Sequence, residues 1–167
     1  MSGKHKLRRE IIGPPGNQNE LITVEDEKGK IVHHHISPLT ISVKLKDILQ
    51  IIVGASILAI PVGFTEETWH LAARLPFLNI FLFLLISILF ISSFVYYNYY
   101  KGHLKEHKWE FIKRTLVTYG FAFLVVALLL SLIQLAPWGT DAALAFKRVI
   151  LVTFPASMSA AVADTIK

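Results

Sequence analysis

Four long apolar stretches occupy most of the chain from Ile48 onward, and they decide what kind of fold it can adopt. The clearest is residues 77–97, FLNIFLFLLISILFISSFVYY, with 21 residues and no formal charge. Residues 116–138 are uncharged as well. A helix of about 20 apolar residues crosses the hydrocarbon core of a bilayer. We therefore expect an all-α membrane protein with four transmembrane helices, embedded in a lipid bilayer.

The predicted spans are at about residues 47–64, 77–99, 116–135 and 142–163. Pro61 is expected to kink or end the first span, because proline removes a backbone donor. Pro76 is well placed to begin the second. Residues 65–70 predict a short helical turn or loop at the surface, and residues 101–114 predict a basic loop. Together the spans form one predicted transmembrane domain, residues 47–167.

Residues 1–46 form a polar segment ahead of the first span. The breaker cluster GPPGN at residues 13–17 rules out a helix there. Two β-prone runs, residues 21–24 and 31–36, flank a charged turn that contains glycine, which predicts a β-hairpin. A lone hairpin is marginal in water, so we expect it to pack on a neighbouring subunit, on the membrane domain or on a strand from residues 6–12.

The distribution of Lys and Arg predicts the orientation. Fourteen of the 17 lie in the N-terminal segment, the loop between the second and third spans and the C-terminus. Cytoplasmic loops carry an excess of these residues. We therefore expect a multi-pass protein of the cell membrane with both termini, and hence the hairpin, in the cytoplasm.

Several function classes find no support in the composition. The chain has no cysteine, which excludes disulfides and thiolate chemistry. The net charge of +5 is explained by the cytoplasmic loops, so no nucleic-acid partner is expected. Nucleophile-elbow, phosphate-loop and dinucleotide motifs are missing from the sequence. We expect neither an enzyme nor a bound cofactor.

Three segments resemble a known family. They are GASILAIPVGFTEETW at residues 54–69, FVYYNYYKG at 94–102 and LAPWGTDAALAFKRVILVTFPASMSAAVADTIK at 135–167. Together they resemble a family of small archaeal and bacterial integral membrane proteins of unknown function, over about residues 45–167. The resemblance implies a four-helix membrane topology and assigns no functional residues.

Charged residues near the ends of the spans are the first candidates for a site. Lys147 and Arg148 lie near the start of the fourth span. Either both reach outer headgroups, or they form a charged vestibule or an anion-coordinating site in a pore, or Arg148 forms a salt bridge with Glu66 or Glu67. Glu66 and Glu67 either face water or form a carboxylate ring at a pore mouth in an oligomer. Asp164 either faces water, faces a lumen, or pairs with a lysine ahead of the first span.

Small residues on the first and fourth spans are the second kind of candidate, with Ser56 and Ser157 as their hydroxyl members. Such faces serve either tight helix packing or the lining of a water-filled path. His33 and His35 share one face of the predicted strand, where they could form a weak metal site, a pH switch or only solvated residues.

These features favour an oligomeric ion channel or pore, regulated through the N-terminal segment. Four helices enclose no channel alone, so a pore requires a homo-oligomer, with inorganic ions as its ligands. A small secondary transporter and a non-conducting scaffold or sensor are the alternatives.

The predicted orientation is tested by labelling. Because the chain has no cysteine, single cysteines can be introduced at Lys4 and Lys105 without a further background change. Both are expected to react with a membrane-impermeant maleimide in inside-out vesicles and to stay unlabelled in intact cells, because both face the cytoplasm. Labelling of the two positions from opposite sides would refute the four-span topology.

Overall fold

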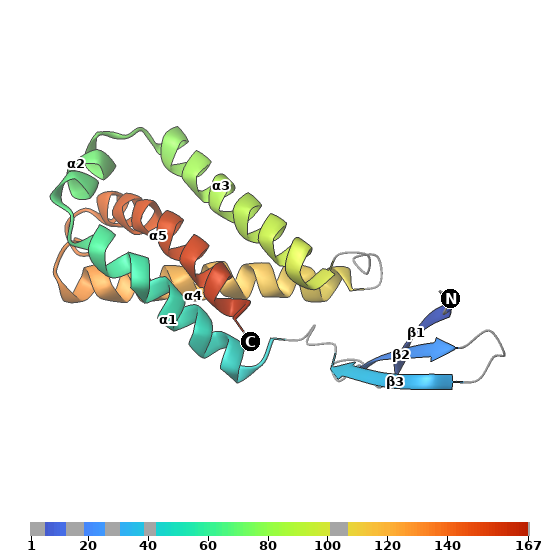
Figure 1. The fold of residues 1–167 in the computed structure, drawn as a ribbon. Coiled ribbons are helices and arrows are strands. Elements are labelled where there is room, and N and C mark those ends of the chain that lie inside the picture. Colours follow the sequence, from blue (N-terminus) through green and yellow to red (C-terminus); the bar gives the residue numbers. More distant parts are fainter. Residues whose placement is uncertain (1–5, 13–18, 26–30, 39–42, 101–106, 167) are drawn as a thin grey trace. The chain divides into compact units, whose positions relative to one another are not determined.

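A computed structural model describes residues 6–12, 19–25, 31–38, 43–100 and 107–166 of the 167-residue chain. The chain divides into two compact units, Met1–Ser42 and Val43–Lys167. Figure 1 labels their helices and strands. The boundary lies four residues before the one expected from the sequence, because Val43 and Lys44 lead directly into the first helix.

The N-terminal unit contains three strands, β1 (Lys6–Ile12), β2 (Asn19–Glu25) and β3 (Ile31–Pro38). They form an antiparallel sheet in the order β1-β2-β3. The two β-prone runs of the sequence lie in β2 and β3, and the partner strand comes from residues 6–12. The breaker cluster at residues 13–17 lies outside the described residues. Three strands also give a small unit better support than a lone hairpin has.

The second unit is helical. It comprises α1 (Leu45–Gly63), α2 (Glu66–Arg74), α3 (Phe77–Val95), the π-helical segment η1 (Tyr96–Tyr100), α4 (Lys108–Leu132) and α5 (Ala142–Asp164). Four of these are long and apolar enough to cross a membrane: α1, α3 with η1, α4 and α5. The four predicted spans are therefore confirmed in number and kind. The surface segment after the first span is the short helix α2.

Helix α1 continues through Pro61 to Gly63, close to the predicted end of the first span at residue 64. The start of the third span differs from its sequence-based bound. Helix α4 begins at Lys108, eight residues before the predicted start of the third span. The prediction excluded those residues because they are charged, yet the helix accommodates them: the cations Lys108 and Lys113 are exposed, while Arg114 is buried against partners on other helices.

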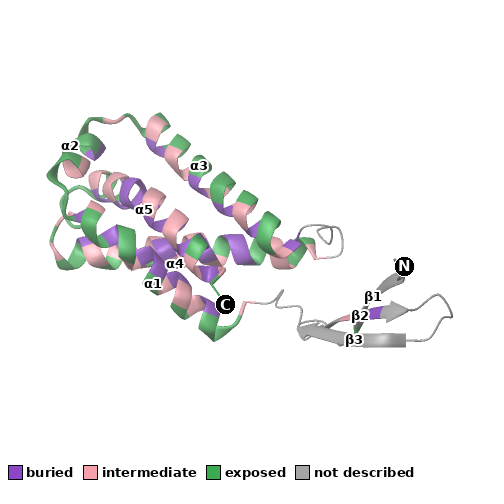
Figure 2. Ribbon diagram, in the orientation of Figure 1, coloured by how far each residue is buried: buried purple, intermediate pink, exposed green. Residues whose placement is uncertain are grey.

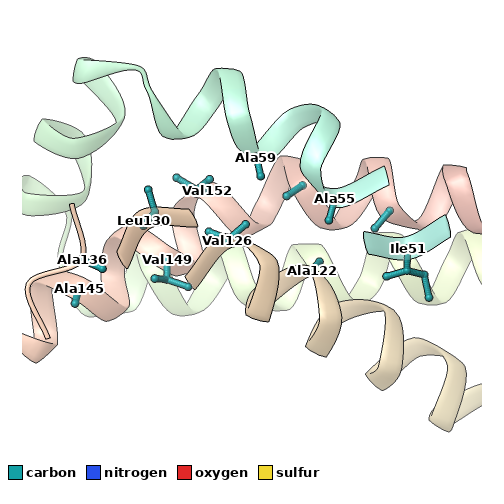
Figure 3. Close-up of a cluster of buried hydrophobic side chains, with 12 residues drawn as sticks. Ile51, Ala55, Ala59, Ala122, Val126, Leu130, Ala136, Ala145, Val149 and Val152 are labelled. Carbon is teal, nitrogen blue, oxygen red and sulfur yellow. The ribbon is translucent and has the colours of Figure 1, made fainter. Parts of the chain in front are cut away.

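Helix α5 is the centre of the helical unit. It packs against α1, α2, α3 and α4, and it is the most buried of the four spans, as Figure 2 shows. Its buried side chains are mostly small, whereas α3 presents large apolar side chains outward. The core shared by α1, α4 and α5 is drawn in Figure 3: Ile51, Ala55, Ala59, Ala122, Val126, Leu130, Ala136, Ala145, Val149, Val152, Ala156 and Ala160.

The closest helix approach is between α1 and α5, at Gly54. A Cβ atom placed on Gly54 would overlap the Ala163 side chain and lie 3.0 Å from the Cα of Ala160 and 3.0 Å from the carbonyl oxygen of Ser159. Small residues permit such approaches between membrane helices. The small-residue faces of the first and fourth spans therefore pack against each other within one subunit.

We predict that Gly54→Ala destabilises the helical unit. The added methyl must displace the α5 backbone, and overpacking of this kind costs about 1–3 kcal/mol of unfolding free energy. The measurement is the thermal unfolding midpoint of detergent-solubilised protein. Gly120→Ala on α4 is the matched control, because a Cβ there meets nothing within 4 Å. Equal midpoints for the two variants would contradict the α1–α5 contact.

Candidate functional site

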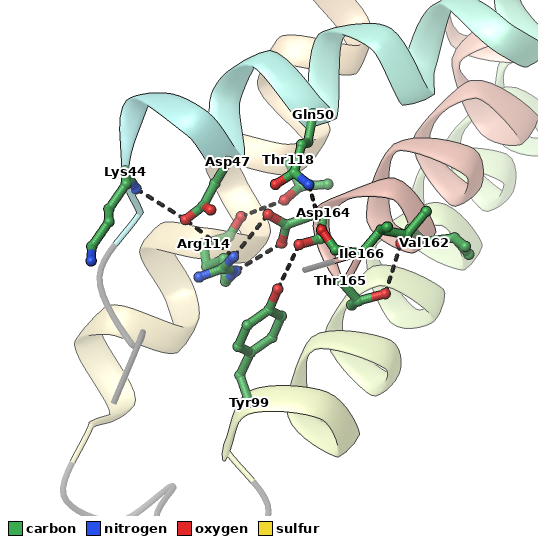
Figure 4. A network of polar contacts seen from close by, with 10 residues as sticks. All are labelled: Lys44, Asp47, Gln50, Tyr99, Arg114, Thr118, Val162, Asp164, Thr165 and Ile166. Carbon is green, nitrogen blue, oxygen red and sulfur yellow. Dashed lines mark hydrogen bonds and ion pairs between the residues drawn. The ribbon is translucent and has the colours of Figure 1, made fainter. Parts of the chain in front are cut away.

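A buried arginine lies at one end of the helical unit. Arg114 is in the second turn of α4 and is 1% exposed, the largest fully buried side chain among the described residues. A cation in the middle of a membrane helix costs about 2.5–3.5 kcal/mol on insertion scales, so such residues nearly always have partners. Figure 4 shows the partners of Arg114.

Asp164, the last residue of α5, is the main partner. The Nε atom of Arg114 donates to Oδ2 of Asp164 at 2.8 Å, and its Nη2 atom donates to Oδ1 at 2.8 Å. This two-point geometry matches the planar guanidinium to the planar carboxylate. Asp164 is itself 2% exposed, so water contributes little to the pair.

A second carboxylate comes from α1. Oδ2 of Asp47 lies 3.4 Å from Nη2 of Arg114 and accepts a hydrogen bond from the backbone N–H of Lys44 at 3.0 Å. That second contact caps the first turn of α1 and holds the carboxylate at the helix N-terminus. The Asp47 side chain is 10% exposed, against 1% for Asp164, so it is the more accessible of the two.

Tyr99 completes the cluster from the end of the α3 span. Its ring lies over the guanidinium, with the Arg114 Cζ atom 3.8 Å from the ring centroid, which is a cation–π contact. Its hydroxyl donates to the backbone carbonyl of Asp164 at 2.7 Å. Tyr99 belongs to the π-helical segment η1, and π-helical turns are frequent at functional sites.

The Arg114 cluster, defined as Asp47, Tyr99, Arg114 and Asp164, thus takes one residue from each of the four spans. Two carboxylates face one guanidinium, so the described groups carry a formal charge of −1. A pair of Arg114 and Asp164 alone would be neutral. The cluster therefore has one more acid than charge compensation requires.

Three hydroxyls of α4 lie within five residues of Arg114 in the chain. Thr118 donates to the Arg114 carbonyl one turn earlier, as helical threonines commonly do. In contrast, Oγ1 of Thr115 and the hydroxyl of Tyr119 are buried without a hydrogen-bond partner. These two residues are four positions apart, so they lie on one face of α4.

The structure places the predicted site residues in different surroundings. The expectation that Asp164 faces water is wrong, because Arg114 holds it inside the helical unit; its partner is not a lysine ahead of α1. The hydroxyls of Ser56 and Ser157 donate to carbonyl oxygens of their own helices, at Ile52 and Phe154. Ser157 is fully buried between helices, where it lines a contact.

Lys147 and Arg148 bind backbone carbonyls near the other end of the unit. Nζ of Lys147 donates to the carbonyl oxygen of Leu75 at 2.8 Å and lies 4.6 Å from the Phe77 ring centroid. Nη1 of Arg148 donates to Leu135 at 2.7 Å. Those carbonyls follow the ends of α2 and α4, where cations are favourable. Within the described ranges, neither side chain forms an ion pair with Glu66 or Glu67.

Glu66 and Glu67 are exposed in the first turn of α2. Glu66 lies 3.4 Å from Nε2 of His70 one turn later. Both carboxylates line a surface pocket of about 390 Å³ with His70, Leu71 and Arg74. A carboxylate ring in an oligomer stays a prediction.

His33 and His35 pair through the β3 backbone with Val24 and Ile22, and their side chains lie outside the described part of the structure. Among the residues it describes, no group of three or more acidic or histidine side chains is placed to hold a metal ion. The weak metal site at these histidines stays a prediction.

The sequence reading missed Arg114, Asp47 and Tyr99 as site residues. Arg114 ends the predicted basic loop, Asp47 begins the first predicted span and Tyr99 ends the second, so none of the three stands out in the sequence. A signal was present: residues of opposite charge occur at span ends that the orientation prediction places on the same side of the membrane.

We predict strong coupling between Arg114 and Asp164. Asp164→Leu removes the two-point partner of buried Arg114 and leaves the longer contact with Asp47, which is expected to cost about 3–5 kcal/mol of unfolding free energy. Arg114→Met, which leaves the buried Asp164 carboxylate without its cation, is expected to cost a similar amount. The double variant is expected to lose far less than the sum. Thermal unfolding in detergent measures the cycle, with Lys113→Met as control, since Lys113 is half exposed beside Arg114. Additive effects would contradict the pair.

Comparison with protein families agrees with this architecture. The model of the family described as "Putative integral membrane protein (DUF2391)" matches residues 12–166, so it extends into the N-terminal strands as well as the helices. Neither curated proteins nor solved structures give a match. The chain therefore belongs to the DUF2391 family of integral membrane proteins, whose function is unknown.

Proposed function

We propose that the protein moves an ion across the membrane and that the ion's path passes through the Arg114 cluster. The observation that supports this is the extra carboxylate beside a buried ion pair. Ionisable groups inside membrane proteins usually mark ion pathways, because they are too costly to keep without a role. Asp47 adds like charge to a pair that is already neutral, so compensation of Arg114 does not explain it.

A path inside the subunit fits the described surfaces better than a pore between subunits. The outward faces of α1 and α3 are lined by large apolar side chains, among them Leu49, Val53, Ile57, Phe81 and Leu85. Water and ions avoid such surfaces, which suit lipid. The small-residue faces that would suit a pore pack on each other at Gly54. A small ion-coupled transporter, which opens and closes its helix contacts, is therefore favoured over the oligomeric channel.

The remaining parts of the proposal follow the sequence prediction. The protein lies in the cell membrane with both termini in the cytoplasm, which places the Arg114 cluster near the cytoplasmic surface. The N-terminal unit regulates transport from that side. A homo-oligomer and an inorganic ion are the proposed partners, and no reaction is catalysed.

Ion flux into proteoliposomes tests the proposal. Purified protein is reconstituted, and gradients of protons, sodium, potassium and chloride are imposed one at a time. We expect flux of at least one of them, and a loss of about tenfold or more in Asp47→Asn. Asparagine keeps the shape and the acceptor for the Lys44 N–H but removes the charge.

Asp141→Asn is the matched control. Asp141 caps the first turn of α5 by accepting from the Leu144 N–H at 2.9 Å, and it is exposed away from the cluster. We expect wild-type flux from it. Absence of flux under every gradient, or equal flux in Asp47→Asn and wild type, would refute the proposal.

A non-conducting scaffold is the second candidate, and the tight α1–α5 approach at Gly54 favours it. In that case the Arg114 cluster only clamps four helices together. The double variant Arg114→Met/Asp164→Leu separates the two functions. If the folded double variant keeps the wild-type phenotype in cells, the scaffold is supported. If it folds but loses the ion flux that the wild-type protein shows, transport is supported.

A further inference from the structure

Thr115 and Tyr119 lie four positions apart on one face of α4, and neither belongs to the Arg114 cluster. Thr115 is 5% exposed, and its Oγ1 atom and the Tyr119 hydroxyl lack hydrogen-bond partners. A helical threonine ordinarily donates to the carbonyl four residues earlier. Thr118 does so and Thr115 does not, so the Thr115 hydroxyl is left available for another polar group.

The free-energy cost of leaving these hydroxyls without hydrogen bonds favours a bound polar molecule beside them. A buried hydroxyl without a hydrogen bond loses its solvation by water and gains nothing in return, so it destabilises the fold. Buried polar groups that lack protein partners are commonly satisfied by internal water, which makes about three hydrogen bonds. Each hydroxyl both donates and accepts, so water held between them extends a hydrogen-bonded chain along α4 from the level of Arg114 toward the middle of the span.

The charges of the cluster decide which ion can use such a chain. Both oxygens of Asp164 are engaged by Arg114, and Asp47 lies 3.4 Å from the same guanidinium. Two carboxylates against one guanidinium repel an anion, and Asp164, with both oxygens bonded to Arg114, is poorly placed to coordinate a metal cation. A proton needs no coordination shell. It adds to an oxygen of Asp47 from water, and it leaves to water again.

Asp47 is the more accessible carboxylate of the cluster. It is faced by Arg114 from α4, by Asp164 from α5 and by the Lys44 N–H on its own chain segment, while Tyr99 from η1 covers Arg114. Its contact with Arg114 is longer than the two bonds of Asp164, and its side chain is more exposed. Protonation of Asp47 therefore leaves the neutral Arg114–Asp164 pair intact.

We propose that the transported ion is a proton, that Asp47 takes it up and releases it, and that water held by Thr115 and Tyr119 carries it between the Arg114 cluster and the middle of the membrane. This inference rests on the proposed transport function and names its substrate. Only O–H bonds form and break along the path, so no redox partner or other reactant is needed.

Proton flux in proteoliposomes tests the inference. An internal pH dye reports flux under an imposed pH gradient, with valinomycin and potassium clamping the membrane potential. We expect Tyr119→Phe and Thr115→Val to lower the initial rate about tenfold or more. Both changes remove a hydroxyl at nearly constant shape, so the unfolding midpoint is expected to stay the same. Thr115→Ser keeps the hydroxyl and is expected to restore the rate.

Tyr96→Phe is the matched control, because Tyr96 lies in η1 and is 40% exposed; its proton flux is expected to equal that of wild type. Proton flux that is unchanged in Tyr119→Phe and Thr115→Val would overturn the inference. Flux of sodium, potassium or chloride without protons would overturn it too, yet leave the transport proposal standing. No flux of any ion would overturn both.

Discussion

The guanidinium of Arg114 is the constraint on which the helical unit depends. A permanent charge in a membrane span must be paired, and its partners come from three other elements: Asp164 from α5, Asp47 from α1 and Tyr99 from η1. Meeting that requirement brings the ends of all four spans together. The start of α1 and the end of α5 are therefore set by charge as much as by hydropathy.

Away from the Arg114 cluster, the helices are held together by close packing and by hydrogen bonds to backbone carbonyls. Lipid is as apolar as the helix surfaces, so the helices associate through close contact and buried polar bonds. Gly54 lets α1 approach α5, and Lys147 and Arg148 bind the carbonyls of Leu75 and Leu135. Two cations that look anomalous in sequence thus tie α5 to the segments that follow α2 and α4.

Length and hydropathy predict the four spans, because any helix that crosses a bilayer needs about the same apolar run. They do not predict the start of α4. A hydropathy window counts Arg114 as a solvent-exposed charge, and nothing local reveals that Asp164, fifty residues later, compensates it. Asp164 was misjudged for the same reason. By contrast, the small residues at Gly54 left two readings open, packing or a water path, and only the spatial position of α5 separates them.

The second carboxylate distinguishes a working site from a clamp. If the cluster served only to join helices, Asp164 alone would neutralise Arg114, and Asp47 would add repulsion between like charges in a medium of low dielectric. Its capping bond to the Lys44 N–H recovers part of that energy, but a neutral amide side chain at the same position would supply a similar bond without the charge. Residues that lower stability without a full compensating interaction are expected at functional sites. Asp47 is such a residue, and it lies where all four spans meet. This juxtaposition is the strongest physical reason to look for ion movement there.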